Sequence, residues 1–252
     1  MMDIGGRFSS NGVVVTFRSA SLVTSAIMLV GFLMSVVCAV VFNFKSTTST
    51  HCGVDNYLPS ISAAIAKPPS SYIWRLSITL CASQRLFTIV CHYAMYTSIP
   101  LNRRQYHWLI NLSTAFELIE NLALIGLTCV SSVENHHIHE ICFVVFQASS
   151  MLFMLVMCMV HNLALNQGTA PTRTEYRSFM RQVSFFVTNI VAFTSALYFF
   201  YRHNRYCEPG VYTIFAFLEY VVVLSNIGFH FLVTSNFGDR VIKFGVWEKV
   251  QF

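Results

Sequence analysis

The chain has 252 residues, of which 55 % are hydrophobic and only 11 % are charged. This charged share is about half that of an ordinary globular protein, so it is too small to cover the surface of a water-soluble domain. Sixteen basic and eleven acidic residues give a net charge of +5. Basic loops beside anionic lipid explain such a charge, so we expect no nucleic acid as a partner.

Six long apolar segments follow one another along the chain. An α-helix needs about 20 apolar residues to cross a bilayer, and backbone groups in lipid must be satisfied within their own segment. The predicted spans are residues 20–44, 72–97, 105–130, 138–165, 182–201 and 211–234. We therefore predict an all-α, polytopic membrane protein, in which residues 1–252 form one domain with six transmembrane helices in one bundle. The polar first 17 residues and the long apolar stretch after them predict an uncleaved signal anchor.

Basic residues flank the predicted spans unevenly. One side holds Arg7, Arg18, Arg103, Arg104, Arg173, Arg177, Arg181, Arg240, Lys243 and Lys249, whereas the other holds Lys45, Lys67, Arg202 and Arg205. The side richer in basic residues is expected in the cytosol. Both termini are thus predicted to be cytosolic, with the first, third and fifth loops in the lumen.

Two of the eight cysteines lie in polar loops. Cys52 is in the first loop and Cys207 in the fifth, on the same predicted luminal side. A luminal compartment permits disulfides, so we predict a bond between these two residues; the alternative is two free thiols. The other six cysteines lie in apolar runs and are interpreted as small buried hydrophobic residues.

Polar residues interrupt four of the spans at similar depths. An ionisable group in a span costs about 2.5 kcal/mol or more, and it usually faces a cavity or a partner. At about 1.5 Å per residue, these groups lie roughly 12–20 Å below the luminal surface; they include Arg85, Glu117, Glu120, Asn121 and Glu219. They predict a polar cleft, although Arg85 and Glu117 are equally consistent with a structural ion pair.

A second polar layer is predicted at the luminal mouth of this cleft. It contains His51, Asp55, Arg75, His136, His137, His139, Glu140, Arg202, His203, Glu208 and Tyr212. Together the two layers suit a lipid with a large anionic headgroup. The histidines near Glu140 are residue types that bind zinc, but the chain has no HExxH or CxxC pattern, so we expect no metal. The alternative for His136 and His137 is an exposed position in the loop.

Several blocks of sequence resemble one known family. They are Phe44–Ser60 (FKSTTSTHCGVDNYLPS), Glu120–Leu124 (ENLAL), Ile138–Glu140 (IHE), Tyr201–Phe215 (YRHNRYCEPGVYTIF) and Leu218–Tyr220 (LEY). The blocks are ordered along nearly the whole chain, and together they are similar to the post-GPI attachment to proteins factor 2 family. That family belongs to a wider Frag1/DRAM/Sfk1 group of six-span proteins.

The resemblance implies a role in remodelling the lipid of GPI anchors in the Golgi membrane, or also in the endoplasmic reticulum membrane. The implied reaction is reacylation of a lyso-GPI at sn-2 with a saturated fatty acid. The implied partners are GPI-anchored proteins, membrane lipid and a separate lipid-remodelling protein. No cofactor is expected, and the acyl donor is left open between acyl-CoA and a phospholipid.

Acyl transfer to a hydroxyl requires a general base, for which a histidine is suited near neutral pH. We predict that His139 is the base, with a carboxylate from another helix, Glu120 or Glu219, orienting it. Asn121 or Tyr212 is the expected oxyanion donor. Arg75, Arg202 and His203 are expected to bind the inositol phosphate, with His51, Glu140 and Glu208 in the same headgroup layer.

Two other functions fit the same residues. The first is a non-catalytic factor that presents or transports lyso-GPI for another transferase. The second is a regulator of the distribution of bulk membrane lipid. Acyl transfer by the purified protein alone separates the enzyme from the first alternative. A defect in bulk lipid asymmetry without a GPI defect indicates the second.

Overall fold

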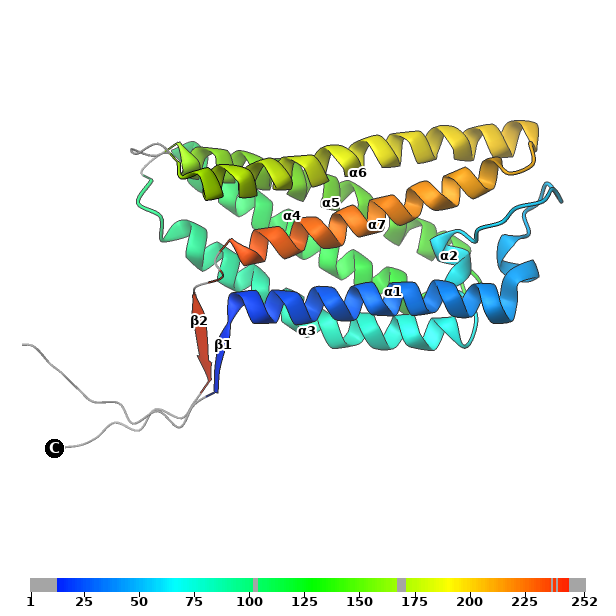
Figure 1. The fold of residues 1–252 in the computed structure, drawn as a ribbon, viewed down its shortest axis with the longest axis horizontal. Coiled ribbons are helices and arrows are strands. Elements are labelled where there is room, and N and C mark those ends of the chain that lie inside the picture. Colours follow the sequence, from blue (N-terminus) through cyan, green and yellow to red (C-terminus); the bar gives the residue numbers. More distant parts are fainter. Residues whose placement is uncertain (1–12, 102–103, 167–170, 237, 239, 245–252) are drawn as a thin grey trace, which may run out of the picture.

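The computed structural model describes residues 13–101, 104–166, 171–236, 238 and 240–244. Within these residues the elements are, in order, β1 (Val13–Thr16), α1 (Phe17–Thr48), α2 (Ile61–Ala64), α3 (Ser70–Thr97), α4 (Arg104–Cys129), α5 (His136–Leu165), α6 (Arg173–Tyr206), α7 (Val211–Ser235) and β2 (Val241–Phe244). The six long helices run side by side in one elongated bundle (Figure 1). The all-α class is as predicted, and the small sheet was not predicted.

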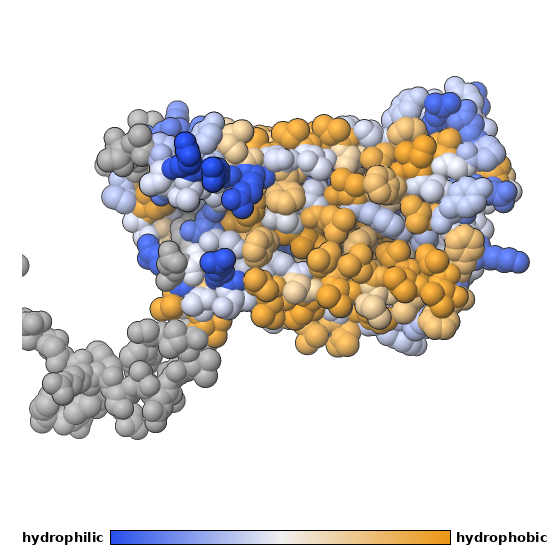
Figure 2. Space-filling view, in the orientation of Figure 1, coloured by the Kyte–Doolittle hydropathy of each residue, from blue (hydrophilic) through white to orange (hydrophobic). Residues whose placement is uncertain are grey.

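The middle of the bundle carries an apolar surface. In Figure 2, hydrophobic residues cover the centre of the visible face and hydrophilic residues gather at both ends. By length and composition, α1, α4, α5, α6 and α7 are each able to cross a membrane. The chain is therefore a polytopic membrane protein with five candidate spans among its described residues.

Helix α3, which coincides with the predicted second span, is not among those five. Its inward face buries the polar side chains of Ser77, Arg85 and His92, and these lower its average hydropathy. Its outward face nevertheless exposes large hydrophobic residues along its whole length, namely Tyr72, Leu76, Leu80, Phe87, Val90 and Tyr93. A helix with polar groups toward the bundle and apolar groups outward is suited to a lipid environment. Its mean hydropathy is nevertheless low, because the average includes the polar inward face.

Strands β1 and β2 join the two ends of the described chain. They pair antiparallel, with Val13 opposite Phe244 and Thr16 opposite Val241, and the Phe17 amide donates to the Arg240 carbonyl at 3.1 Å. The end of the bundle with this sheet is called the sheet end below. The opposite end, with α2 and the α6–α7 turn, is called the loop end. Because both ends of the described chain meet at the sheet end, the helices pass along the bundle an even number of times (Figure 1).

Local sequence explains where the helices at the loop end begin and stop. Asn135 caps α5, because its side chain accepts a hydrogen bond from the Ile138 amide at 3.1 Å. Helix α6 ends at Tyr206, with Cys207 as its C-cap. Helix α7 begins after Gly210, whose positive φ of 75° is readily adopted by glycine. Helices α1 and α6 extend past the predicted spans, to Thr48 and to Tyr206.

Two buried apolar clusters hold the helices together. One lies between α4, α5 and α7 and includes Tyr106, Phe153 and Phe229. The other lies between α1 and α3 and includes Phe32 and Trp74, together with Ile65, which follows α2. Because Ile65 belongs to this second cluster, the segment around α2 is packed into the bundle rather than lying free above it.

Candidate functional site

The first loop (residues 49–69) is bound to α7 and to the α6–α7 turn along its length. The hydrogen bonds that do this include Gly210 N to Asp55 O at 3.0 Å, Tyr57 N to Thr213 Oγ1 at 2.9 Å, and Tyr220 Oη to Pro59 O at 2.7 Å. Each bond uses a backbone group of the loop that would otherwise need another partner. The loop is therefore held in one conformation by residues far away in the sequence.

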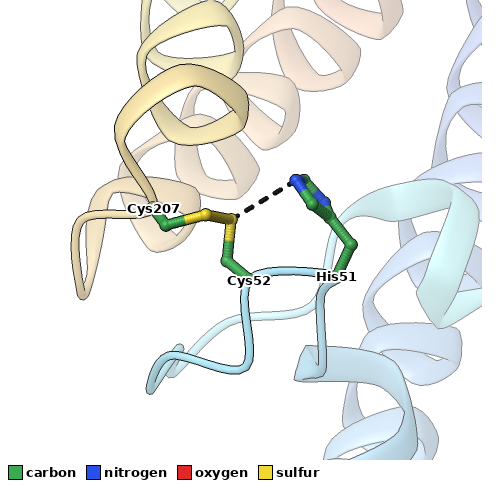
Figure 3. Close-up of side chains that lie close together, drawn as sticks. All are labelled: His51, Cys52 and Cys207. Atoms are coloured by element: carbon green, nitrogen blue, oxygen red, sulfur yellow. Dashed lines mark hydrogen bonds between the residues drawn. A yellow bond between two sulfur atoms is a disulfide. The ribbon is translucent and has the colours of Figure 1, made fainter.

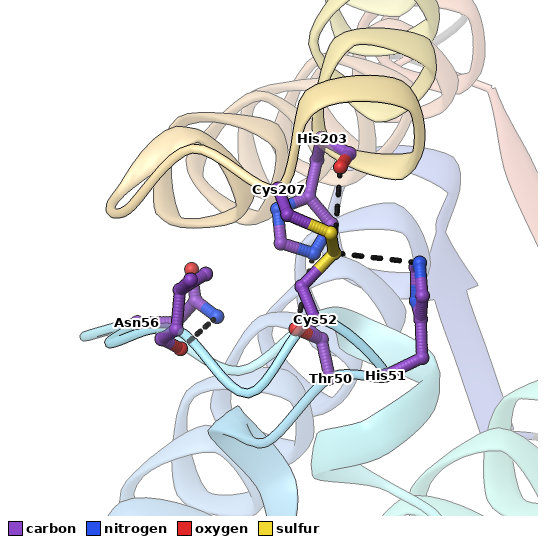
Figure 4. Close-up of a disulfide and its surroundings, with 7 residues drawn as sticks. Thr50, His51, Cys52, Asn56, His203 and Cys207 are labelled. Carbon is purple, nitrogen blue, oxygen red and sulfur yellow. Dashed lines mark hydrogen bonds between the residues drawn. A yellow bond between two sulfur atoms is a disulfide. The ribbon is translucent and has the colours of Figure 1, made fainter.

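A disulfide between Cys52 and Cys207 adds a covalent tie between the first loop and the end of α6 (Figure 4). The structure thus contains the predicted pair. His51 Nε2 lies 3.4 Å from the Cys52 sulfur (Figure 3). His51, Cys52 and Cys207 are the single group of three or more potential metal-ligand residues whose ligand atoms lie within 4.8 Å of one another among the described residues. Because the two sulfurs are bonded to each other, they do not supply the thiolates that a metal needs.

His203 is buried next to the disulfide. Its Nε2 lies 3.0 Å from Thr50 Oγ1, and its ring lies 5.0 Å from that of Tyr212 and 5.8 Å from that of His51. The structure therefore brings together three of the predicted headgroup residues, His51, His203 and Tyr212. Their contacts in this state are with one another and with the loop.

His139 contacts a serine hydroxyl through one ring nitrogen and a backbone carbonyl through the other. Its side chain is buried at the start of α5, with 4 % of the residue exposed. Nδ1 lies 2.8 Å from the Val130 carbonyl oxygen, and Nε2 lies 2.9 Å from Ser62 Oγ in α2. A carbonyl only accepts, so Nδ1 carries the hydrogen. In the neutral ring, Nε2 then accepts a hydrogen bond from the Ser62 hydroxyl, which is the arrangement of a general base beside a nucleophile.

Glu219 lies next to this pair, but within the described part of the chain its hydrogen bond is to Ile61 and not to His139. Its Oε2 accepts a hydrogen bond from the Ile61 amide at 3.1 Å, one residue before Ser62. The carboxylate therefore holds the first turn of α2 against α7. The group that orients His139 in this structure is the Val130 carbonyl rather than a carboxylate.

The two arginines predicted to bind phosphate are both paired with carboxylates. Arg75 Nη2 lies 2.6 Å from Glu134 Oε2, and Arg202 makes two hydrogen bonds to Glu208, at 2.7 and 3.0 Å. The backbone amide of Ser131 and then Arg75 lower the pKa of Glu134 to about 2. An anionic headgroup would have to compete with these carboxylates for the arginines.

The remaining predicted residues of this layer face outward. Glu140, His136 and His137 are exposed at the start of α5, whereas His139 is buried. Glu140 and His137 are one and two positions from His139, so at about 100° per residue their side chains do not share its direction. His136, three positions away, lies nearer the same face of the helix but is itself exposed. Among the described residues they do not form a metal-ligand group with it.

Glu120 and Asn121 belong to a separate polar network deeper in the bundle. Arg85 donates to Asn121 and, at 3.4 Å, to Glu120 Oε1. The same oxygen lies 2.9 Å from His230 Nε2 and accepts from Asn226 at 3.0 Å. Nine residues separate Asn121 from Val130, which is about 13 Å along a helix. The structure thus does not bring Glu120 or Asn121 to His139.

Arg85 and Glu117 are not an ion pair, which corrects one interpretation of the sequence. Arg85 pairs with Glu120, whereas Glu117 lies 3.2 Å from Nδ1 of His92. His92 in turn lies 3.3 Å from Thr234 on α7. A cavity of about 40 Å³ adjoins Arg85, Glu117 and His230, which is enough space for a water molecule.

An apolar groove runs along the outside of the bundle between α5 and α6. Its volume is about 470 Å³, and Gln147 is its one polar lining residue; the others include Phe143, Leu155, Phe186, Phe193 and Leu197. From Phe143 to Leu155 the groove follows α5 for about 18 Å. Its size and composition are those of a site for an apolar chain.

Sequence reasoning missed Ser62, Asn226 and the role of His230. Ser62 lies in a loop rich in serine and threonine, where no pattern separates it from its neighbours. Asn226 and His230 are four residues apart on α7, so they share one face of that helix. This spacing was the available signal that both approach Glu120.

The fold and these contacts define a multi-pass helical membrane protein in which a serine of the tethered first loop contacts a histidine of α5. Residues 16–240 match the family model described as Frag1/DRAM/Sfk1/Cwh43P N-terminal domain. The chain is 38 % identical to the acyltransferase PGAP2 of Xenopus tropicalis over 95 % of both chains. It is 39 % identical to post-GPI attachment to proteins factor 2 of Drosophila melanogaster, over 85 % of this chain and 83 % of that one.

A further relative, the acyltransferase PGAP2 of Danio rerio, is 34 % identical over 78 % of this chain and 84 % of its own. No solved structure matches. The protein is a member of the PGAP2 family and carries the Frag1/DRAM/Sfk1 domain.

Proposed function

We propose that this protein transfers a saturated fatty acyl chain to the sn-2 hydroxyl of lyso-GPI-anchored proteins. Family membership supports a role in remodelling GPI anchors, since the relatives carry the names acyltransferase and post-GPI attachment to proteins factor. The observation that carries the proposal is His139, whose Nδ1 is held by the Val130 carbonyl while Nε2 faces a hydroxyl. That is the geometry of a general base for acyl transfer between oxygens.

The proposal includes a location and an orientation. The loop end faces the lumen of the Golgi. Helix α3 also crosses the membrane, which brings the number of spans to six. Most basic residues near the helix ends lie toward the sheet end, such as Arg18, Arg104, Arg173 and Arg177. The ends of membrane spans that are richer in basic residues are usually cytosolic. The disulfide at the loop end fits a luminal compartment. In this orientation His139 is at the level where lipid headgroups meet water.

The groove between α5 and α6 supports a second candidate, a factor that presents lyso-GPI without catalysing the transfer. A groove for an apolar chain is needed by a carrier and by an enzyme alike. Catalysis by the isolated protein therefore decides between the two.

The test is transfer by the purified full-length protein reconstituted in lipid. The protein is incubated with lyso-GPI and either a phospholipid or acyl-CoA, and the anchor lipid is measured by mass spectrometry. We expect a saturated chain at sn-2 with wild-type protein and a loss of about 100-fold or more in His139→Ala. The matched control is His137→Ala, an exposed histidine on the same turn, which is expected to keep full activity.

Two results would contradict the enzyme. Normal transfer by His139→Ala would remove its assigned base. If no donor yields product while the same preparation restores anchor remodelling in deficient cells, the carrier is the correct function.

A further inference from the structure

We propose that Ser62 is the nucleophile and that it carries the acyl chain as a covalent ester between the donor and the lyso-GPI. This inference rests on the proposed acyltransferase function and assigns it a two-step course. None of the sequence patterns singles out Ser62. It is identified by its 2.9 Å contact with His139 Nε2.

The hydrogen bonds of His139 determine the direction of proton transfer. Because the Val130 carbonyl holds the hydrogen on Nδ1, the lone pair of the neutral ring is at Nε2, where the Ser62 hydroxyl lies. A serine is a weak nucleophile until an adjacent base accepts its proton. The pair therefore has both parts of an activated nucleophile, with a backbone carbonyl as the group that orients the base.

The same contact argues against His139 acting directly on the acceptor hydroxyl. That role requires Nε2 to be free to accept the acceptor's proton, but in this structure Nε2 is occupied by Ser62. A covalent intermediate removes the conflict, because the serine is acylated before the acceptor reacts. Nε2 is then available to the second hydroxyl.

The position of Ser62 is fixed by the residues on each side of it. Glu219 binds the Ile61 amide before it. Ser60 caps α2 by accepting from the Ala63 amide at 3.3 Å. After it, Ala64 and Ile65 are buried. Ser62 as a residue is half-buried, whereas His139 is buried, so the serine is more exposed than its base.

The chemistry balances with a phospholipid as donor. Ser62 Oγ attacks the acyl carbonyl carbon while its proton moves to His139 Nε2, and collapse breaks the donor ester and returns that proton to the leaving glycerol oxygen. The lyso-GPI hydroxyl then attacks the Ser62 ester and gives its proton to Nε2. Collapse breaks the serine ester, and Ser62 Oγ takes the proton back. One ester is exchanged for another, and no oxidant or reductant is needed.

The experiment looks for the intermediate without the acceptor. Reconstituted full-length protein is incubated with a phospholipid that carries an isotope-labelled acyl chain, then treated with neutral hydroxylamine, which removes thioesters from cysteines and leaves oxygen esters. Mass spectrometry of the peptide that contains Ser62 is expected to show one acyl chain. Addition of lyso-GPI is expected to remove this label and to form labelled product. An acyl-CoA arm tests the other donor class.

Variants at position 62 test whether Ser62 acts as a nucleophile or has only a structural role. Ser62→Ala is expected to lose the label and about 100-fold or more of the transfer rate. Ser62→Cys is expected to acquire a label that hydroxylamine removes. Ser49→Ala changes an exposed serine of the same loop and is expected to behave as wild type. Formation of the Cys52–Cys207 disulfide, read on a non-reducing gel, reports folding of each variant.

The outcomes distinguish the two proposals. Product formed at the wild-type rate by folded Ser62→Ala, or product from wild type without any labelled serine, overturns the covalent step and leaves the acyltransferase standing. Wild-type protein that yields neither label nor product with either donor overturns the acyltransferase, and the covalent step with it.

Discussion

Arg85 on α3 and Glu120 on α4 form a buried ion pair, with Arg85 Nη2 3.4 Å from Glu120 Oε1. Among the described residues, the other carboxylate oxygen, Oε2, is buried without a hydrogen-bond partner. The charge is therefore stabilised through a single oxygen, shared by Arg85, His230 and Asn226. Loss of one member leaves a costly buried group.

This arrangement predicts a non-additive double mutant. Arg85→Met is expected to lower the free energy of unfolding by about 3–5 kcal/mol, because it leaves Glu120 without its permanent cation. Arg85→Met combined with Glu120→Gln is expected to recover much of that loss. Thermal unfolding in matched detergent measures both. If the double variant is as unstable as the sum of the single ones, the pair is not coupled.

Glu219 is expected to act on the transfer rate by positioning α2. Glu219→Leu removes the acceptor for the Ile61 amide, a hydrogen bond worth about 0.5–1.5 kcal/mol, and should release the segment that carries Ser62. Glu219→Gln keeps a carbonyl oxygen at the same place and should retain most of the activity. The readouts are transfer rate and the rate of maleimide labelling of Ser62→Cys in each background. Equal loss in both Glu219 variants would mean that the carboxyl group itself is needed, and that an acceptor oxygen at this place is not enough.

The disulfide is expected to contribute substantially to stability. It closes a loop across a sequence separation of 155 residues, and bonds that close long loops typically contribute about 2–5 kcal/mol. Cys52→Ala combined with Cys207→Ala should therefore lower the melting temperature and the transfer activity together. Cys38→Ala, a free cysteine in α1, is the matched control. Reductant should affect wild type and leave the double variant unchanged.

Glu134 predicts an acid-sensitive contact at the start of α5. Its folded pKa of about 2 lies below its ordinary 4.5, so its contribution is present above pH 4.5 and is lost as the pH falls toward 2. Between these values the melting temperature of wild type should fall more steeply than that of Glu134→Gln. Arg75→Gln should show an intermediate slope, because the Ser131 amide is the larger cause of the shift. Superimposable profiles for wild type and Glu134→Gln would refute the assignment.

Patterns along the chain were sufficient to predict the six long helices and the pairing of the two loop cysteines. Continuous apolar runs marked the positions of the six long helices, and topology placed Cys52 and Cys207 on one side. Four-residue strands such as β1 are too short for an alternating pattern to stand out. The sheet was missed for that reason.

Partners within the bundle were harder to predict. Glu117 and Glu120 are three residues apart on one face of α4, so depth alone does not say which one meets Arg85. The structure resolves this through α7, whose His230 and Asn226 both reach Glu120. Ser62 and His139 are 77 residues apart, and only the tethered path of the first loop brings them together.

The tethers of the first loop also constrain when the site is assembled during synthesis. Cys52 leaves the ribosome long before Cys207, which follows 155 residues later and at roughly 5–20 residues per second takes on the order of 8–30 s to be made. Until then its thiol has no partner, and Tyr57 and Pro59 lack the α7 groups that bind them. The first loop therefore reaches its final conformation only after α7 is made. A chain stalled before α7 would contain both His139 and Ser62 but would lack the α7 contacts that hold the loop beside α5.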